Sequence, residues 1–156
     1  MSIERRRAEG LELPGETLLF MQRLWDLVHA LDVRSKRMRK LLGVTGPQRL
    51  VIRVLGKSPD LTARDLSDTL GIDPSTLTGI LDRLETQGMI TRRPDPEDRR
   101  RARFKLTAAG ARIDRERKGT VEAAVRRALG RADEATIERT IELLLLLTAE
   151  LTRDDD

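Results

Sequence analysis

Two short amphipathic segments joined by a three-residue turn constrain the fold of this chain more than any other feature. The first begins at Thr62 and Asp65, which form a capping-box pattern, and ends at Gly71, a residue type favoured in the left-handed conformation after a helix. The second follows Asp73, which can cap a helix, and begins at Pro74, which suits the first helical position. Apolar residues recur at helical spacing in both segments, at Leu66, Leu70, Leu77, Ile80, Leu81 and Leu84. These signals predict a helix-turn-helix unit.

The pattern becomes extended after Gly88. Residues 89–93 and 103–107 both have the composition of short strands. Residues 94–102 between them are polar and contain two prolines, so they are expected to form a loop. We therefore predict a β-hairpin with an exposed, basic tip.

Two helices are predicted before the helix-turn-helix unit. Apolar residues at helical spacing cover residues 16–42, and this pattern stops at Gly43. Thr45 and Gln48 then form a second capping-box pattern, which introduces a helix that ends at Gly56.

Two further helices are predicted after the hairpin, over residues 107–129 and 133–151, with Asp133 as the cap of the last one. Residues 143–147 are all leucine, so this helix is apolar on every side and has to be buried against something. In a chain this small, we expect a partner subunit to cover it.

Composition excludes several classes of function. The chain has 156 residues, of which 38% are hydrophobic, and this fits a single domain. It has no cysteine and one histidine, His29, which removes thiol chemistry and leaves little for metal or acid–base chemistry. We expect no enzymatic activity, no metal and no cofactor. No apolar run reaches the roughly 18 to 20 residues that span a bilayer, and no signal-peptide pattern opens the chain, so a cytoplasmic location is expected.

Positive charge is concentrated in the middle of the chain. Residues 33–53 include seven basic and no acidic residues, and residues 92–105 include seven basic and three acidic ones. Such an uneven distribution is typical of a module that binds a polyanion, and nucleic acid is the first candidate. The alternative on charge alone is an arginine-rich chain with solvated helix faces.

The second helix of the helix-turn-helix unit has an outward face suited to DNA. Small residues open this face and would let the helix end approach base edges, while Arg83 is long enough to reach a flanking phosphate. The predicted DNA-binding residues here are Ser75, Thr76, Thr78 and Arg83. The alternative is an ordinary amphipathic helix with a solvated face.

The hairpin tip is the most specific string in the sequence. Asp98 directly precedes Arg99, Arg100 and Arg101, so its carboxylate can brace one arginine while another projects. A narrow A·T-rich minor groove attracts such a projecting arginine. These four residues are the predicted DNA contacts of the hairpin, and a charged, solvated loop is the alternative.

The order of elements resembles the MarR family of winged-helix transcriptional regulators over roughly residues 16–152. The resemblance is strongest at four short motifs: Leu84-Glu85 with Gly88, Arg92-Arg93, Asp98-Arg99-Arg100, and Leu106-Thr107 with Gly110. The resemblance implies a homodimer built from the terminal helices, a recognition helix in the major groove and a wing arginine in the minor groove. It also implies control by a small ligand, often an aromatic or phenolic acid, bound between the dimer helices and the DNA-binding lobe. Many members carry a basic residue where this chain has Gly79, which shifts base contact toward Ser75, Thr76 and Thr78.

An effector pocket is predicted under the first helix. Trp25 and His29 are four residues apart and share a helix face, and Arg49 or Arg53 could pair with the carboxylate of a small aromatic or organic acid. The alternative for Trp25 is a plain core or interface position.

The predicted fold class is mainly α, a winged helix-turn-helix with a short β-hairpin wing and long N- and C-terminal dimerisation helices. We expect an N-terminal arm at residues 1–15, dimerisation helices at residues 16–43 and 107–152, and a DNA-binding lobe at residues 45–107. The predicted function is a homodimeric regulator, most simply a repressor, that binds double-stranded DNA at a pseudo-palindromic operator. The alternative is a winged-helix module that binds a protein partner through its hairpin, without sequence-specific DNA binding.

Overall fold

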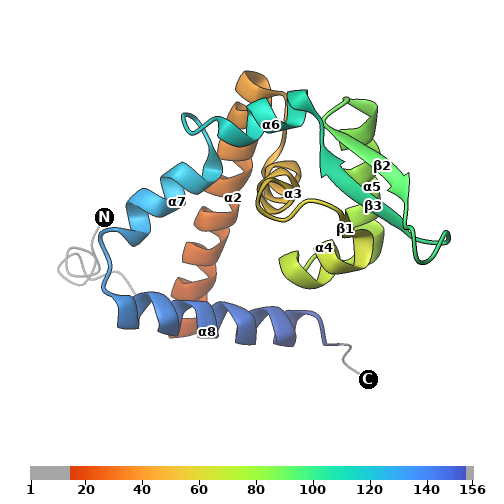
Figure 1. Ribbon diagram of the computed structural model, residues 1–156. Coiled ribbons are helices and arrows are strands. Elements are labelled where there is room, and N and C mark those ends of the chain that lie inside the picture. Colours follow the sequence, from red (N-terminus) through yellow and green to blue (C-terminus); the bar gives the residue numbers. More distant parts are fainter. Residues whose placement is uncertain (1–14, 154–156) are drawn as a thin grey trace.

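The computed structural model describes residues 15–153, so the arm predicted at residues 1–15 lies almost wholly outside the described residues (Figure 1). The described chain is mainly helical with a small antiparallel sheet, which confirms the predicted fold class. The elements in order are α2 (Glu16–Leu42), α3 (Gly46–Lys57), β1 (Leu61–Thr62), α4 (Ala63–Leu70), α5 (Pro74–Thr86), β2 (Ile90–Pro94), β3 (Ala102–Leu106), α6 (Ala108–Arg115), α7 (Val121–Leu129) and α8 (Glu134–Leu151).

Local capping signals set most helix starts. Thr45 and Thr62 each form a complete capping box, with Gln48 and Asp65 respectively, as predicted. The carboxylate of Asp133 accepts the backbone N–H of Thr136 at 2.9 Å, which confirms the predicted cap of α8. These interactions join residues three apart, so the sequence alone was sufficient to predict them.

The buried core lies in the lobe formed by α3, α4, α5 and the sheet. Its buried side chains are Val44, Val51, Ile52, Leu55, Leu66, Leu77, Ile80, Leu81, Leu84, Ile90 and Phe104. The apolar face of α5 therefore points into this core, as its spacing predicted, and the opposite face remains in solvent. This packing fixes how α5 is presented at the surface.

The sheet has one strand more than the sequence predicted. The hairpin strands pair with Pro94 opposite Ala102, one residue away from the predicted strand ends. The two-residue strand β1 joins the other edge of β3, with Leu61 opposite Phe104. We did not predict β1 because its pairing partner lies more than forty residues away and two residues carry no periodic signal.

The helix predicted over residues 107–129 is wrong, because the chain breaks between α6 and α7. Glu116 is extended, with φ −64° and ψ 135°, and Gly119 has a φ of 74°. Thr120 then caps α7 by accepting the N–H of Ala123 at 3.2 Å. The break lets α7 pack against α2 while α6 packs against α3.

Close contact at Gly110 positions α6 against the base of the hairpin. A Cβ atom at this position would overlap the carbonyl oxygen of Met89. The hydroxyl of Thr107 also donates to the carbonyl of Gly88 at 2.6 Å. The helices beyond the hairpin are therefore tied to the hairpin by close backbone contact.

Large apolar side chains outside the lobe are exposed in the single chain. Trp25 is 65% exposed on α2, and Leu145 is 67% exposed on α8. Neither α7 nor α8 contains a buried residue. Within residues 15–153, no helix is both long and apolar enough to cross a membrane.

Candidate nucleic-acid interface

The residues predicted to read DNA from α5 share one exposed face. Ser75, Thr76, Thr78 and Arg83 are all exposed, as is Gly79. A Cβ atom built on Gly79 would meet nothing within 4 Å, so the backbone itself forms the surface there. The structure thus brings the predicted residues together on one side of the helix.

The start of α5 is held by Asp73. Its carboxylate accepts the N–H groups of Ser75 and Thr76, at 2.9 and 3.1 Å, and also the hydroxyl of Ser75. The hydrogen bond from the Ser75 hydroxyl, followed by those from the backbone, lowers the pKa of Asp73. Because the Ser75 hydroxyl donates its proton to Asp73, its exposed oxygen retains only acceptor capacity.

The tip of the wing is a closed turn organised by Asp98. Its carboxylate accepts the backbone N–H of Arg100 at 3.0 Å and pairs with Arg101 Nε at 3.3 Å. The sequence predicted that Asp98 braces one of the three arginines after it, and the ion pair identifies Arg101 as that arginine. Within the described chain no ion pair involves Arg99 or Arg100, so both exposed guanidinium groups remain available.

The base of the wing is fixed by a buried carboxylate that sequence reasoning missed. Asp95 is 4% exposed, accepts the N–H of Glu97 at 2.8 Å and pairs with Arg103 Nε at 2.8 Å. The hydrogen bond from Glu97, with a further contribution from Arg103, lowers the pKa of Asp95. This carboxylate therefore ties the residues that follow β2 to Arg103 on β3.

Arg92 joins the wing to α5. It reaches from β2 to two carboxylates on α5, at 2.9 Å to Asp82 and 3.4 Å to Glu85. Its guanidinium carbon lies 5.2 Å from the centre of the Phe104 ring, a distance typical of a cation–π contact. The sequence marked Arg92 as part of the family resemblance, but its two partners depend on the tertiary fold.

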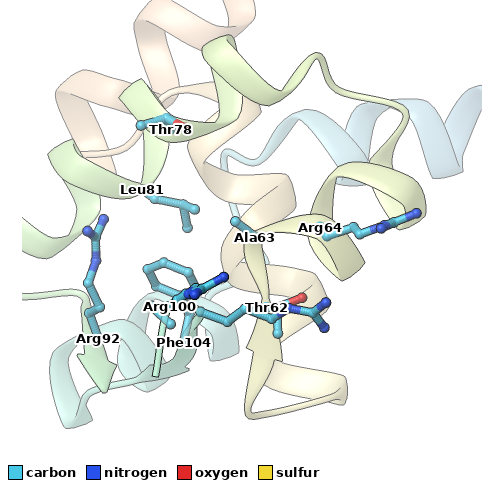
Figure 2. Close-up of a pocket in the computed structure, with 10 residues that line it drawn as sticks. Thr62, Ala63, Arg64, Thr78, Leu81, Arg92, Arg100 and Phe104 are labelled. Atoms are coloured by element: carbon cyan, nitrogen blue, oxygen red, sulfur yellow. The ribbon is translucent and has the colours of Figure 1, made fainter. Parts of the chain in front are cut away.

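A cavity of about 380 Å³ lies between α4, α5 and the wing. Figure 2 shows side chains from these elements around it, with Arg92 and Arg64 drawn on opposite sides and Phe104 between them. The lining includes the guanidinium-bearing residues Arg64, Arg92, Arg100 and Arg101, together with Thr62 and Thr78. Arg64 was not predicted as a site residue; it becomes one because β1 places the first turn of α4 next to the hairpin.

Arg49 and Arg53, predicted to hold an acidic effector, are used in packing. Arg49 is 1% exposed; its Nε donates to Glu122 at 2.7 Å, and its terminal nitrogens donate to the carbonyls of Ile113, Asp114 and Glu116. Arg53 pairs with Asp114 at 2.6 Å. The Arg49 guanidinium therefore holds both α6 and α7 against α3, and the Arg53 guanidinium holds α6.

Trp25 and His29 lie on an exposed face of α2. Neither residue lines the cavity between α4, α5 and the wing. A cavity of about 530 Å³ instead lies farther along α2, between α2, α3 and α7. Its lining residues are Leu31, Asp32, Ser35, Gly46, Pro47, Leu50, Val121, Glu122 and Val125. Trp25, His29, Arg49 and Arg53 are not among these lining residues, and an effector site under the first helix stays a prediction.

Comparisons with known proteins agree with this architecture. The family model described as "MarR family" matches residues 42–101. The regulator FarR of Neisseria gonorrhoeae is 32% identical over 83% of this chain and 88% of its own length. The organic hydroperoxide resistance transcriptional regulator of Bacillus subtilis is 40% identical, but the chain spans only 48% of that relative's length.

Solved structures show the same fold. Sco3205 of Streptomyces coelicolor, a MarR family regulator solved in complex with DNA, superposes with a TM-score of 0.74 at 21% identity, over 93% of this chain and 97% of that one. PcaV from the same organism, solved with its natural ligand, gives a TM-score of 0.68 at 22% identity, over 89% and 96%. On the strength of the FarR similarity and this shared fold, the chain belongs to the MarR family of winged helix-turn-helix transcriptional regulators.

Proposed function

We propose that this chain is a homodimeric, ligand-responsive regulator that binds double-stranded DNA in a sequence-specific manner and represses transcription. The observation that carries the proposal is the arginine-lined cavity between α5 and the wing. If α5 enters a major groove and the wing tip enters the adjacent minor groove, one sugar-phosphate backbone has to pass between them. That backbone would lie over the arginine-lined cavity.

Each side chain of this surface has a distinct role in the proposal. Ser75, Thr76 and Thr78 contact base edges, and Arg83 contacts the flanking backbone. Arg64 contacts the backbone from α4, since its nearest carboxylate, on Asp68, is 3.9 Å away and both groups are exposed. Arg99 or Arg100 enters the minor groove. Asp98 and Arg101 shape the tip, and Arg92 sets the spacing between α5 and the wing.

Homodimerisation is supported by the apolar side chains outside the lobe. In the single chain, Leu143 to Leu146 are at least 41% exposed, and so is Trp25 at the opposite end of the chain. Covering these side chains with a second copy removes an exposed apolar surface that a monomer would not tolerate. We assign Trp25 to this dimer surface. The symmetry then calls for half-sites about 10 to 10.5 base pairs apart, or a multiple of that spacing.

Repression and ligand control complete the proposal. A dimer that occupies an operator excludes other proteins without any further contact surface, so repression is the simplest outcome. The cavity between α2, α3 and α7 lies where the dimer helices meet the DNA-binding lobe, so a small organic ligand there can favour one spacing of the recognition helices. We place this activity in the cytoplasm and assign it no catalysis, metal or cofactor.

DNA binding distinguishes this function from the alternative, a module that uses its wing to bind a protein. Sequencing the genomic fragments retained by the purified protein should return a pseudo-palindromic operator. On that operator, Arg64→Ala and Arg83→Ala should each reduce the salt slope of binding by about one, because each removes one contact with a phosphate of the DNA backbone. Arg112→Ala, on the exposed side of α6, is the matched control and should leave the slope unchanged. Retention of random fragments with a salt-independent affinity would reject the proposal.

A further inference from the structure

The cavity between α2, α3 and α7 has an apolar body and an acidic rim. Its apolar side chains come from all three helices, and its volume of about 530 Å³ falls within the roughly 300 to 1,000 Å³ usual for small-molecule sites. The charged residues of its lining are Asp32 from α2 and Glu122 from α7. These two carboxylates bear on which class of ligand the proposed regulator can sense.

The groups that would hold an anion at this cavity are already occupied. Arg49 contacts Glu122, which lines the cavity, but Arg49 itself is 1% exposed. Its N–H groups donate to Glu122 and to the carbonyls at the end of α6. Any acid in the cavity would therefore meet Glu122 rather than the guanidinium beneath it. An additional carboxylate would face the like charges of Asp32 and Glu122, and the residues that line the cavity include no basic side chain.

The start of α3 also lacks free donors, although a helix N-terminus ordinarily attracts anions. The N–H of Gly46 donates to Ser35 Oγ at 2.8 Å, and Pro47 has no N–H. The N–H groups of Gln48 and Arg49 donate to the side chain and the carbonyl of Thr45. At the start of α7, Glu122 itself places a carboxylate at the positive end of the helix.

A cation is better matched to the same groups. Glu122 uses Oε1 for Arg49 and is 27% exposed, so its carboxylate has further acceptor capacity toward the cavity. Asp32 pairs with Lys36 at 2.6 Å, but both side chains are more than half exposed, and such a surface pair exchanges readily. One ammonium group could thus reach either carboxylate while an aromatic or aliphatic body contacts Leu31, Leu50 and Val125.

We propose that this cavity binds an apolar molecule carrying a protonated amine, and that it discriminates against organic acids. The inference rests on the proposed ligand control and names the chemistry of its ligand. It replaces the acidic effector expected from the sequence, because Arg49 and Arg53 are consumed by packing. A ligand bound here touches α2, α3 and α7 together, so it couples the proposed dimer helices to the lobe that carries α5.

Calorimetric titration of the full-length protein, without DNA, tests the ligand class with two probes of the same ring and opposite charge. We expect 1-naphthylmethylamine to bind one molecule per chain at least about tenfold more tightly than 1-naphthoic acid, the difference typical of one charge-assisted hydrogen bond. Leu50→Trp, which fills the cavity, should abolish binding of the amine. Equal or tighter binding of the acid, or amine binding that survives Leu50→Trp, would overturn the proposal.

Charge variants test which groups recognise the amine. Glu122→Gln should weaken amine binding about tenfold without weakening that of the acid, and Asp32→Asn should do the same to a smaller degree. Asp32 is exposed, so Asp32→Asn keeps the test valid if Glu122→Gln fails to fold. Glu150→Gln on α8 removes an exposed, paired carboxylate outside the cavity and is the matched control. Amine affinity unchanged by both Asp32→Asn and Glu122→Gln would overturn the assignment.

Because ligand binding is measured without DNA, the two proposals fail separately. A protein that binds the amine but no operator would contradict the proposed regulator and support this ligand class. A protein that binds its operator but prefers the acid would support the regulator and contradict this ligand class.

Discussion

Arg49→Met tests whether a buried guanidinium holds α6 and α7 against α3. The substitution keeps a long side chain in the core but removes the hydrogen bonds to the carbonyls of Ile113 and Glu116 and the ion pair with Glu122. The carbonyl of Ile113 would keep the N–H of Glu116 as a donor, and the carbonyl of Glu116 would keep Arg117 Nη1, at 3.2 Å. The loss therefore falls mainly on Glu122, which would remain without its buried partner.

The expected loss is about 3 kcal/mol in the free energy of unfolding. Breaking a buried ion pair from one side costs roughly 3–5 kcal/mol, and the lower end applies here because Glu122 is 27% exposed and can regain water. For a chain of this size, that corresponds to a fall in Tm of about 6–12 °C. Arg49→Lys keeps the positive charge but replaces the planar guanidinium group, so it should lower the free energy of unfolding by about half as much as Arg49→Met.

Urea unfolding followed by circular dichroism measures this loss, with Arg53→Met as the matched control. Arg53 also pairs with α6, but its side chain is 23% exposed, so about 1.5 kcal/mol, the lower end for a hydrogen bond to a charged group, is expected. Protein concentration has to be held constant across variants, because a dimer's stability depends on it. An Arg49→Met protein within about 0.5 kcal/mol of the parent would refute the role of Arg49.

Three further predictions concern α5, α8 and the helix caps. Gly79→Ala should raise the free energy of unfolding by about 0.5–1 kcal/mol, because the site is open and alanine favours a helix, and it should weaken operator binding. If both the stability and the operator affinity increased, this face of α5 would not contact DNA. Deleting residues 133–156 should give an aggregating or unfolded chain in sedimentation experiments, and a soluble, folded monomer would contradict dimerisation through α8. Side-chain hydrogen bonds lower the pKa values of three helix-capping aspartates in the folded state; the pairs are Thr62 with Asp65, Ser75 with Asp73, and Thr136 with Asp133. The ionised aspartates should therefore stabilise the fold above the ordinary Asp pKa of about 3.9, and this stabilisation should be lost as pH falls through the lowered pKa values. Asp73→Asn should reduce this acid dependence in urea titrations between about pH 5 and pH 2, and an unchanged profile would contradict the assignment.

The sequence was sufficient for the features whose interactions are local. Helix caps at Thr45, Thr62, Asp73 and Asp133 join residues two or three apart, so both partners are visible in one short stretch. The buried face of α5 follows equally from its helical period, because one apolar stripe can face only one core. The helix-turn-helix unit and its outward face were predictable for these reasons.

Tertiary structure decided the features whose partners are distant in the chain. The break between α6 and α7 has local signals in Gly119 and Thr120, but Arg49, more than sixty residues earlier, supplies the donors that hold its carbonyls. Strand β1 exists because Leu61 meets Phe104 across the sheet.

Long-range pairing also decided which charges remain available for binding. Sequence reasoning assigned Arg49 and Arg53 to an effector, while folding directs them to Glu122 and to Asp114. An arginine shows its charge in the sequence, but its partner depends on which carboxylate or carbonyl the fold brings within hydrogen-bond distance. For this reason, two features could be identified only from the tertiary structure. One is the acidic rim of the cavity between α2, α3 and α7, and the other is the arginine-lined cavity between α4, α5 and the wing.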